Sequence, residues 1–429
     1  MNRRDEILSL DRARVWHPYT QMQEYLEQTE PLVLESAQGS RFRDVDGRSY
    51  IDGNASWYCC ALGHQHPRLV KALSAQAEKM CHVPLAGIAH EPSARLAEEL
   101  CTVAPAGLSR VFYSDDGSTA VEVSLKLALQ YWAQNGRPER TRFLALDGGY
   151  HGDTMGAVSV SGIEVFRRSF GNVLIDCLRA PTGADGYQQA FDVLGQLLSA
   201  HAGELAAVIV EPIAQGAVGM RIYPPDLLRA LRDLTRQHDV FLICDEVFTG
   251  YGRTGPFWAS EHADVEPDVL CTAKGFTGGM LPMAATLVSE RIFSGFLGDA
   301  ERTFFYGHTF CGNPLGAALA REVLRVYRDE DVLALAAGKA RRIAAAFERF
   351  RELPDVVETR SVGMIGALDL AGSKSYLEPR GRRVYREALR RGAYLRPLGN
   401  TIYITPSINI PDRDLDELLA ILEESVRAA

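Results

Sequence analysis

Two short apolar segments decide the fold of this chain: Val240-Phe-Leu-Ile-Cys-Asp245 and Asp268-Val-Leu-Cys-Thr-Ala-Lys274-Gly275. Apolar runs of this length, bounded by turn signals, predict buried strands of a parallel sheet. Each run is followed by a charged side chain. In an open α/β sheet, ligands bind at the carboxyl ends of the strands. The sequence therefore places Asp245 and Lys274 where they could serve one ligand.

A lysine amine and a carboxylate together suit pyridoxal phosphate. This cofactor needs an amine to form its imine and a carboxylate to keep its ring nitrogen protonated. The protonated ring then withdraws electrons from the substrate carbon that loses its proton. The alternative is that Asp245 only caps a loop and Lys274 lies on the surface, and the spacing of these two residues alone leaves both interpretations open.

The composition indicates a soluble globular protein with two domains or lobes. The chain has 429 residues, of which 46% are hydrophobic and 24% charged, and this length is too great for a single core. The net charge of −9 gives no sign of the basic face that nucleic-acid binding needs. Neither a secretory signal nor an apolar run long enough for a bilayer is present. We therefore expect no nucleic-acid partner and no membrane.

The cysteines and histidines give no sign of a disulfide framework or a metal site. The eight cysteines show no C-x-x-C spacing, which is typical of the reduced thiols of a cytoplasmic enzyme. His64 and His66 lie close together but without acidic or thiol neighbours, so we interpret them as part of a turn. The sequence predicts no metal.

The pattern of elements divides the chain into three segments. Residues 1–65 form an N-terminal arm that belongs to a small domain, with a hairpin about Asp46-Gly47. Residues 66–328 form a large cofactor-binding domain of alternating strands and helices. Residues 329–429 form the rest of the small domain, an α+β lobe with a strand at 362–370.

A phosphate site is predicted where a strand meets a helix. The strand Arg110–Ser114 leads through Asp115-Asp116 into Gly117-Ser118-Thr119, and an apolar helix follows from 120 to 134. Free amides and hydroxyls at a helix N-terminus favour an anion by roughly 0.3–1 kcal/mol. The alternative, that Ser118 or Thr119 simply caps the helix, stays open.

Two further residues suit substrate or cofactor contacts. Tyr150 follows the strand 142–146 among glycines, where a planar ring could stack on it, although a tight turn with an exposed tyrosine would have the same sequence. Arg396 precedes a proline, and its guanidinium could bind a carboxylate with two hydrogen bonds or simply be solvated.

The glycine-rich segment Gly250-Tyr-Gly-Arg-Thr-Gly255 predicts a mobile loop. It is not a dinucleotide-binding motif, because no helix pattern follows it.

Together these motifs resemble the class III (omega) aminotransferases, which are fold-type I pyridoxal-phosphate enzymes. The resemblance covers nearly the whole chain and is carried by Glu211-Pro212, Asp245-Glu246-Val247, Gly252-Arg-Thr-Gly255, Lys274-Gly275 and Gly307-His308-Thr309. It implies an α/β fold with a large, mixed, mostly parallel sheet and a smaller α+β domain from both ends of the chain. It also implies a homodimer with active sites at the subunit interface, an amino donor and a keto acid as substrates, and pyridoxal 5'-phosphate as cofactor.

The resemblance also implies a role for each site residue. Lys274 would bond the cofactor and move the proton, Asp245 would pair with the ring nitrogen, and Tyr19 would assist catalysis. The cofactor-binding residues would be Gly117, Ser118, Tyr150, Asp245, Lys274, His308 and Thr309, the last two reaching the neighbouring subunit's phosphate. The substrate-binding residues would be Tyr19, Trp57, Tyr150, Lys274, Gly307 and Arg396.

Flanking segments narrow the expected reaction. Trp16-His-Pro-Tyr-Thr20, Ser56-Trp57, Gly149-Tyr-His-Gly-Asp-Thr154 and the Arg396-Pro segment resemble members of the class that act in biotin biosynthesis. This implies transamination of 8-amino-7-oxononanoate to 7,8-diaminononanoate, with S-adenosyl-L-methionine as donor. Two residues differ from the pattern of these members. Tyr58 stands where members that use S-adenosyl-L-methionine often have a second tryptophan, and His308 stands where some have proline. Because some relatives use lysine instead, lysine stays possible as the donor. The alternatives are another omega-aminotransferase acting on ornithine, 4-aminobutyrate or a diamine, an aminomutase, and a binding protein that kept the fold.

Overall fold

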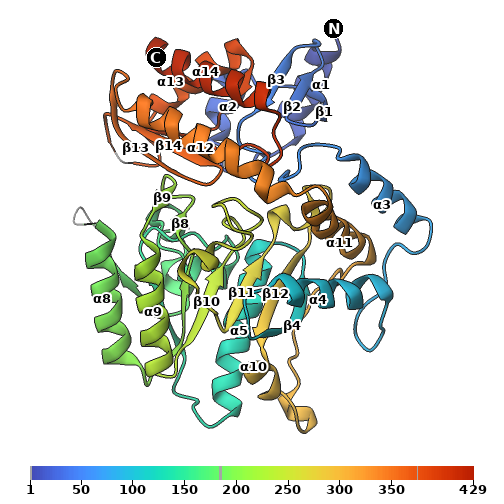
Figure 1. Ribbon diagram of the computed structural model, residues 1–429, viewed down its shortest axis with the longest axis vertical. Coiled ribbons are helices and arrows are strands. Elements are labelled where there is room, and N and C mark those ends of the chain that lie inside the picture. The colour runs from blue at the N-terminus through green and yellow to red at the C-terminus, as the bar shows by residue number, and fades with distance from the viewer. Residues whose placement is uncertain (1, 183–185, 374) are drawn as a thin grey trace.

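The main sheet lies in the lower body of the molecule in Figure 1, a computed structural model that describes residues 2–182, 186–373 and 375–429. In this described part, seven strands pair in the order β4-β12-β11-β10-β7-β5-β6. Their bounds are β4 (Leu108–Ser114), β5 (Arg142–Leu146), β6 (Cys177–Ala180), β7 (Leu205–Val210), β10 (Phe241–Asp245), β11 (Val269–Thr272) and β12 (Ala284–Ser289). β12 runs antiparallel to both of its neighbours and the other pairs are parallel. The expected mixed, mostly parallel sheet is confirmed.

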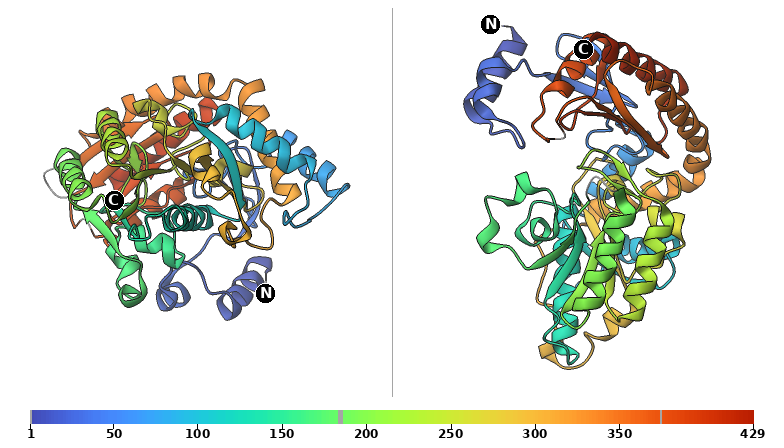
Figure 2. Two further views of the ribbon diagram at one scale, coloured as in Figure 1. Left: turned by 90° about the horizontal axis from the view of Figure 1, so that it is seen from below. Right: turned by 90° about the vertical axis from the view of Figure 1, so that its left-hand side faces the viewer.

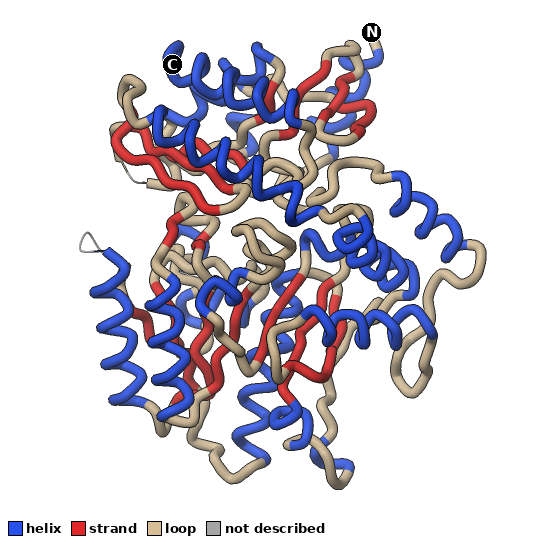
Figure 3. Tube along the Cα trace, viewed as in Figure 1, coloured by secondary structure: helices blue, strands red, loops and turns tan. Residues whose placement is uncertain are grey.

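Helices cover both faces of this sheet because successive side chains of each strand point to opposite sides. Phe241 and Ile243 of β10 share one core cluster with helix α5 (Gly117–Gln134). Leu242 and Cys244 face the other way and pack with α8 (Gly186–His201) and α9 (Pro225–Gln237). Figure 3 shows the strands in the middle of the lower body with helices around them. Helices therefore shield both faces of the sheet from solvent, which explains the continuous apolar sequence of β10.

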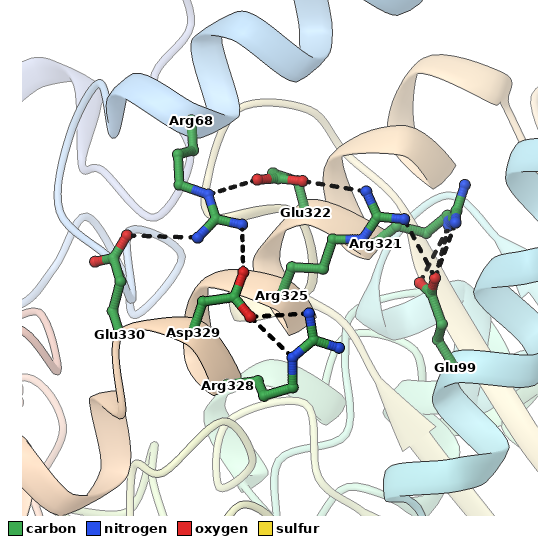
Figure 4. A network of polar contacts seen from close by, with 8 residues as sticks. All are labelled: Arg68, Glu99, Arg321, Glu322, Arg325, Arg328, Asp329 and Glu330. Atoms are coloured by element: carbon green, nitrogen blue, oxygen red, sulfur yellow. Dashed lines mark hydrogen bonds and ion pairs between the residues drawn. The ribbon is translucent and has the colours of Figure 1, made fainter.

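Three helices pack together beside the β4 edge of the sheet: α3 (Pro67–Ala77), α4 (Glu91–Val103) and α11 (Pro314–Asp329). Leu69, Leu100 and Val323 place a side chain from each helix in one core cluster. Figure 4 shows the ion pairs over this contact, which join Arg68, Glu99, Arg321, Glu322, Arg325, Arg328, Asp329 and Glu330. Exposed pairs contribute about 0–1 kcal/mol each, so the apolar contact supplies most of the stability.

The upper body combines the two ends of the chain. One sheet has the order β1-β2-β3-β15 and another the order β13-β14-β16, with the bounds β1 (Leu34–Gln38), β2 (Arg41–Asp44), β3 (Ser49–Asp52), β13 (Val356–Val362), β14 (Ile365–Leu370), β15 (Ala393–Tyr394) and β16 (Thr401–Ile404). β15 pairs with β3, so segments far apart in sequence share a sheet. In Figure 1 the blue and red ends of the chain lie together at the top. β2 and β3 form the hairpin predicted about Asp46-Gly47.

The strand predicted at 362–370 is present only from 365 to 370. Residues 362–370 do not form a single strand, because the chain turns at Gly363, whose φ is +55°, and β13 and β14 pair as an antiparallel hairpin. Glycine adopts this backbone conformation without a steric penalty, so it permits the turn.

The remaining elements complete both bodies. They are α1 (Arg3–Arg14), α2 (Met22–Gln28), α6 (Met155–Val160), α7 (Glu164–Arg167), α10 (Glu290–Ser294), α12 (Val332–Phe350), α13 (Arg380–Arg391), α14 (Asp412–Ala428), β8 (Ala214–Gln215), β9 (Arg221–Ile222) and the 3-10 turns η1 (Gly171–Val173), η2 (Ala259–Ala263), η3 (Lys274–Thr277) and η4 (Ala300–Arg302). α1 stands at the edge of the molecule in Figure 2, and none of its residues is buried. Among the helices described, none has the length and apolar composition that a bilayer crossing requires.

Candidate active site

A cavity of about 550 Å³ opens at the carboxyl ends of the strands of the main sheet. Eight of the residues expected at the site line it: Tyr19, Trp57, Gly117, Ser118, Tyr150, Asp245, Lys274 and Arg396. β10 ends in Asp245 and β11 ends just before Lys274. The pairing of β10 with β11 brings the carboxylate and the amine to neighbouring strand ends.

Lys274 begins the η3 turn with a φ of +49°, a left-handed conformation that is uncommon for a residue with a side chain. Its Nζ lies 4.9 Å from the centre of the Tyr58 ring and 5.6 Å from that of Phe248. Burial lowers the pKa of the Lys274 amine. More of this amine is therefore unprotonated at neutral pH than for a lysine in water, as a proton acceptor requires.

Asp245 is held by a buried histidine. The Nδ1 atom of His151 lies 2.7 Å from Oδ2 of Asp245, and Oδ1 accepts a hydrogen bond of 3.1 Å from the Val247 amide. Both side chains of the His151–Asp245 pair are nearly inaccessible to solvent. An ionised carboxylate can only accept, so His151 donates from Nδ1 and fixes the orientation of Asp245.

Glu211 positions the loop that carries Tyr150. Its two carboxylate oxygens accept hydrogen bonds from the amides of Tyr150 at 3.0 Å and of Gly216 at 2.9 Å. Burial raises the pKa of Glu211 to about 7. Because Glu211 lines the same cavity as Asp245, its partial protonation at neutral pH limits the repulsion between these two carboxyl groups.

The start of helix α5, where the sequence predicts an anion site, carries free backbone amides. Asp116 caps the helix by accepting from the Thr119 amide, and Thr119 Oγ1 accepts from the amides of Asp115 and Asp116. Among the described residues, these contacts leave the first-turn amides of Gly117 and Ser118 without an acceptor. Free amides at the positive end of a helix suit a phosphate group. The helix is capped and can still hold an anion.

Two tyrosines of the cavity share one carboxylate. The hydroxyls of Tyr19 and Tyr150 lie 3.0 Å apart, and both donate to Oδ2 of Asp153, Tyr150 at 2.7 Å. The Asp153 amide in turn donates to Ser118 Oγ at 3.2 Å. Asp153 therefore couples the tyrosine pair to the anion site.

Trp57 and Tyr58 reach the cavity from a strained turn. Residues Ala55, Ser56, Trp57 and Tyr58 have φ values of 44°, 47°, 57° and 73°. Residues with a side chain in this region cost of order 1–3 kcal/mol each. Asn54 supports the turn: its Nδ2 donates to the Tyr403 carbonyl and its Oδ1 accepts from the Arg396 amide. Strain of this kind often occurs at functional sites.

Arg396 presents a guanidinium to the cavity. Its Cζ lies 4.7 Å from the centre of the Trp57 ring. The phenols of Tyr58, Tyr376, Tyr394 and Tyr403 lie close enough to act on its charge. Among the described residues no carboxylate forms an ion pair with Arg396, which leaves the guanidinium able to bind an anionic substrate group.

Gly307, His308 and Thr309 lie outside the cavity of their own chain. The His308 ring turns to Asp115 and Tyr306 instead, with Nδ1 3.0 Å from Asp115 Oδ2 and Nε2 3.0 Å from the Tyr306 hydroxyl. Any contact between this segment and a cofactor phosphate would have to be made across a dimer.

Several residues around the cavity were not singled out from the sequence. His151, Asp153, Phe166 and Tyr376 all line it. The sequence could have indicated only His151 and Asp153, because they follow Tyr150 in the same glycine-rich turn.

The prediction of a mobile loop at residues 250–255 was wrong. This segment lies in the interior, where Arg253 is 2% exposed and donates to the Pro406 carbonyl.

Comparison with known proteins gives the family. The family described as aminotransferase class-III matches residues 23–426. This chain belongs to the class-III aminotransferases. It is 41% identical to the adenosylmethionine-8-amino-7-oxononanoate aminotransferase of Nitratidesulfovibrio vulgaris, over 100% of this chain and 82% of the relative. The Geobacter sulfurreducens protein of the same name is 39% identical, over 97% and 96%.

Solved structures agree with this assignment. The aminotransferase of that name from Methanocaldococcus jannaschii superimposes with a TM-score of 0.95 at 34% identity, over 99% of each chain. An amine transaminase from an uncultivated Pseudomonas species, solved in its PLP-bound form, gives 0.90 at 33% identity, over 97% of this chain and 98% of that one. The fold is that of class-III transaminases.

Class-III aminotransferases use pyridoxal phosphate, and the cavity of this aminotransferase fits that group. Lys274 supplies an amine with a lowered pKa, Asp245 a fixed carboxylate, and Gly117 and Ser118 two free amides at a helix N-terminus. These are the partners that an aldehyde, a ring nitrogen and a phosphate require.

Proposed function

We propose that this aminotransferase converts 8-amino-7-oxononanoate to 7,8-diaminononanoate in biotin biosynthesis, with S-adenosyl-L-methionine as the amino donor. The observation that carries the proposal is the Arg396 guanidinium, which shares a cavity with Lys274 and forms no ion pair among the described residues. A long keto acid has a carboxylate for Arg396 and an aliphatic chain for walls formed by Tyr19, Trp57 and Phe166. The reaction is the one in the names of the relatives.

The residues of the cavity divide the chemistry between them. When bound, pyridoxal phosphate withdraws electrons from the substrate carbon that loses its proton. Lys274 Nζ takes that proton and later returns one, for which its lowered pKa suits it. Asp245, fixed by His151, supplies a negative charge for a protonated ring nitrogen. Tyr19 and Tyr150, held by Asp153, orient the polar end of the substrate.

Replacing Arg396 by methionine tests the proposed acceptor. We expect the KM for 8-amino-7-oxononanoate to rise by about 10–100-fold, because a hydrogen bond to a charged group contributes roughly 1.5–3 kcal/mol. The kcat at saturation should change much less. Steady-state assays with the free acid and with its methyl ester measure this effect.

The ester and a second variant are the controls. Wild type and the Arg396→Met variant should use the ester equally poorly, and Arg386→Met, on the exposed side of α13, should behave as wild type. Equal KM values of Arg396→Met and wild type for the free acid would mean that Arg396 does not bind the carboxylate.

We also propose a homodimer with its active sites at the subunit interface. Phe305 and Phe310, on either side of Gly307–Thr309, are 84% and 57% exposed, and apolar side chains gathered in this way favour burial by a partner. Because the His308 ring is turned to Asp115, the Thr309 hydroxyl is the group that we assign to the neighbouring subunit's phosphate. Small-molecule substrates would enter between the two subunits.

The cytoplasm is the compartment that we propose for this enzyme. All eight cysteines carry free thiols, which supports a reducing environment. When the purified enzyme is oxidised without reductant, mass spectrometry should detect no intrachain disulfide. A disulfide formed in most of the chains would contradict the cytoplasmic assignment.

A further inference from the structure

Asp115, His308 and Cys311 bring three kinds of metal-ligand atom together at the rim of the active-site cavity, which Asp115 also lines. Asp115 directly follows β4, while His308 and Cys311 lie in the segment that precedes α11. One ligand atom of each residue lies within 4.8 Å of the other two. All three residues are partly buried in the single chain.

The His308 ring is oriented as a metal ligand would be. Its Nε2 is 3.0 Å from the Tyr306 hydroxyl, and a ligating histidine almost always uses its other ring nitrogen in such a hydrogen bond. Its buried Nδ1 is only 3.0 Å from Asp115 Oδ2, yet it makes no well-directed hydrogen bond in the described chain. Asp115 and His308 thus hold a carboxylate oxygen and a ring nitrogen side by side without a well-directed hydrogen bond between them.

Cys311 completes the set. Its Sγ accepts a hydrogen bond of 3.0 Å from the His308 amide, and such a bond stabilises a thiolate. Burial raises the pKa of the Cys311 thiol, but a bound metal ion displaces the thiol proton directly. The two residues between His308 and Cys311 allow both side chains to reach one ion.

We propose that Asp115, His308 and Cys311 bind a divalent cation of the zinc class, with a solvent molecule in the fourth position. Imidazole, carboxylate and thiolate are the ligands that Zn²⁺ takes, at about 2.0–2.3 Å. Tetrahedral geometry at these lengths separates neighbouring ligand atoms by about 3.3–3.8 Å. Asp115 Oδ2 and His308 Nδ1, at 3.0 Å, would separate slightly. The longer ligand-atom distances, which are at most 4.8 Å, would shorten by about 1–1.5 Å.

A cation at this position would join two segments that serve the active site. Asp115 lies two residues before Gly117, and Thr309 lies between His308 and Cys311. Occupancy would fix the loop that carries Thr309 against the start of α5. We expect the bound ion to raise the thermal stability of the enzyme without taking part in transamination.

Cobalt is the probe that tests this site, because Co²⁺ bound tetrahedrally by a thiolate absorbs visible light at longer wavelengths than the cofactor. The cofactor-loaded enzyme is first treated with a chelator and then titrated with Co²⁺. We expect one Co²⁺ per chain and its displacement by Zn²⁺. Cys311→Ala should weaken Co²⁺ binding at least about 100-fold and leave transamination unchanged, and Tyr306→Phe should weaken it about 10–100-fold.

The matched control is Cys81→Ala, which removes an exposed cysteine elsewhere and should bind Co²⁺ as wild type does. The proposal is overturned if wild type binds no Co²⁺ at micromolar concentration. It is equally overturned if Cys311→Ala and Tyr306→Phe bind Co²⁺ as tightly as wild type, because the ion would then be bound elsewhere. If Cys311→Ala does not fold, the Tyr306→Phe titration alone decides the outcome.

Discussion

Replacing Lys274 by alanine should reduce transamination by about 10⁴-fold or more, because this residue both bonds the cofactor and moves the proton. No other lysine of the described chain lines the cavity, so none can take over. Steady-state rates with saturating donor and acceptor measure the loss. Borohydride treatment followed by peptide mapping should label Lys274 in wild type and nothing in the variant.

The surface lysine Lys79 provides the matched control. Lys79→Ala should keep wild-type activity and labelling, since its side chain is exposed and does not line the cavity. Lys274→Ala should fold normally, as judged by circular dichroism. Substantial turnover by a folded Lys274→Ala enzyme would contradict the assigned role.

The same variant tests the proposed dimer. A chain with Lys274→Ala still offers Thr309 to its neighbour, and a chain with Thr309→Ala still offers Lys274. Refolding the two together should restore activity to about a quarter of the sites, because half of the dimers are mixed and each has one intact site. Activity no greater than the sum of the separate variants would mean that Thr309 does not act across an interface.

Replacing Asp245 by asparagine should have the second largest effect, a loss of about 10³-fold in kcat. Asparagine has the same shape and can still accept the hydrogen bond from His151, so the change removes the charge and little else. Without that charge, the ring nitrogen loses the partner that keeps it protonated. The cofactor should stay bound, which absorbance spectra check.

Asp268→Asn is the matched control for this charge. Asp268 directly precedes β11, at the opposite edge of the sheet from the cavity, and pairs with Arg232 at 2.7 Å. We expect this variant to lose stability, because it leaves a mostly buried arginine without its partner, and to keep its kcat within a few fold. Equal kcat losses in both variants would indicate that Asp245 acts only structurally.

The sequence predicts the main sheet and the placement of the residues at its edge because both depend on local patterns. Asp245 and Lys274 follow apolar runs whose length and composition identify buried strands. Parallel pairing then brings strand ends to one edge, so residues far apart in sequence line one cavity.

Other features depend on contacts that no local pattern records. His151 follows Tyr150, but its contact with Asp245 depends on the direction of one side chain. The left-handed turn at Ala55–Tyr58 has no glycine to mark it. Asp115 is far from His308 and Cys311 in the sequence, and only the folded chain brings the three side chains together. The spacing of histidines and cysteines along the sequence therefore could not indicate this cluster.

The most direct test of the account is a half-reaction on the purified, cofactor-loaded enzyme without acceptor. S-adenosyl-L-methionine and lysine are added separately while the absorbance of the lysine-bound cofactor is followed. We predict that S-adenosyl-L-methionine removes this absorbance and that 8-amino-7-oxononanoate then restores it. If only lysine removes the absorbance and 8-amino-7-oxononanoate restores it, then the proposed acceptor is right and the donor is lysine. If 8-amino-7-oxononanoate restores nothing after either donor, the proposed reaction is wrong.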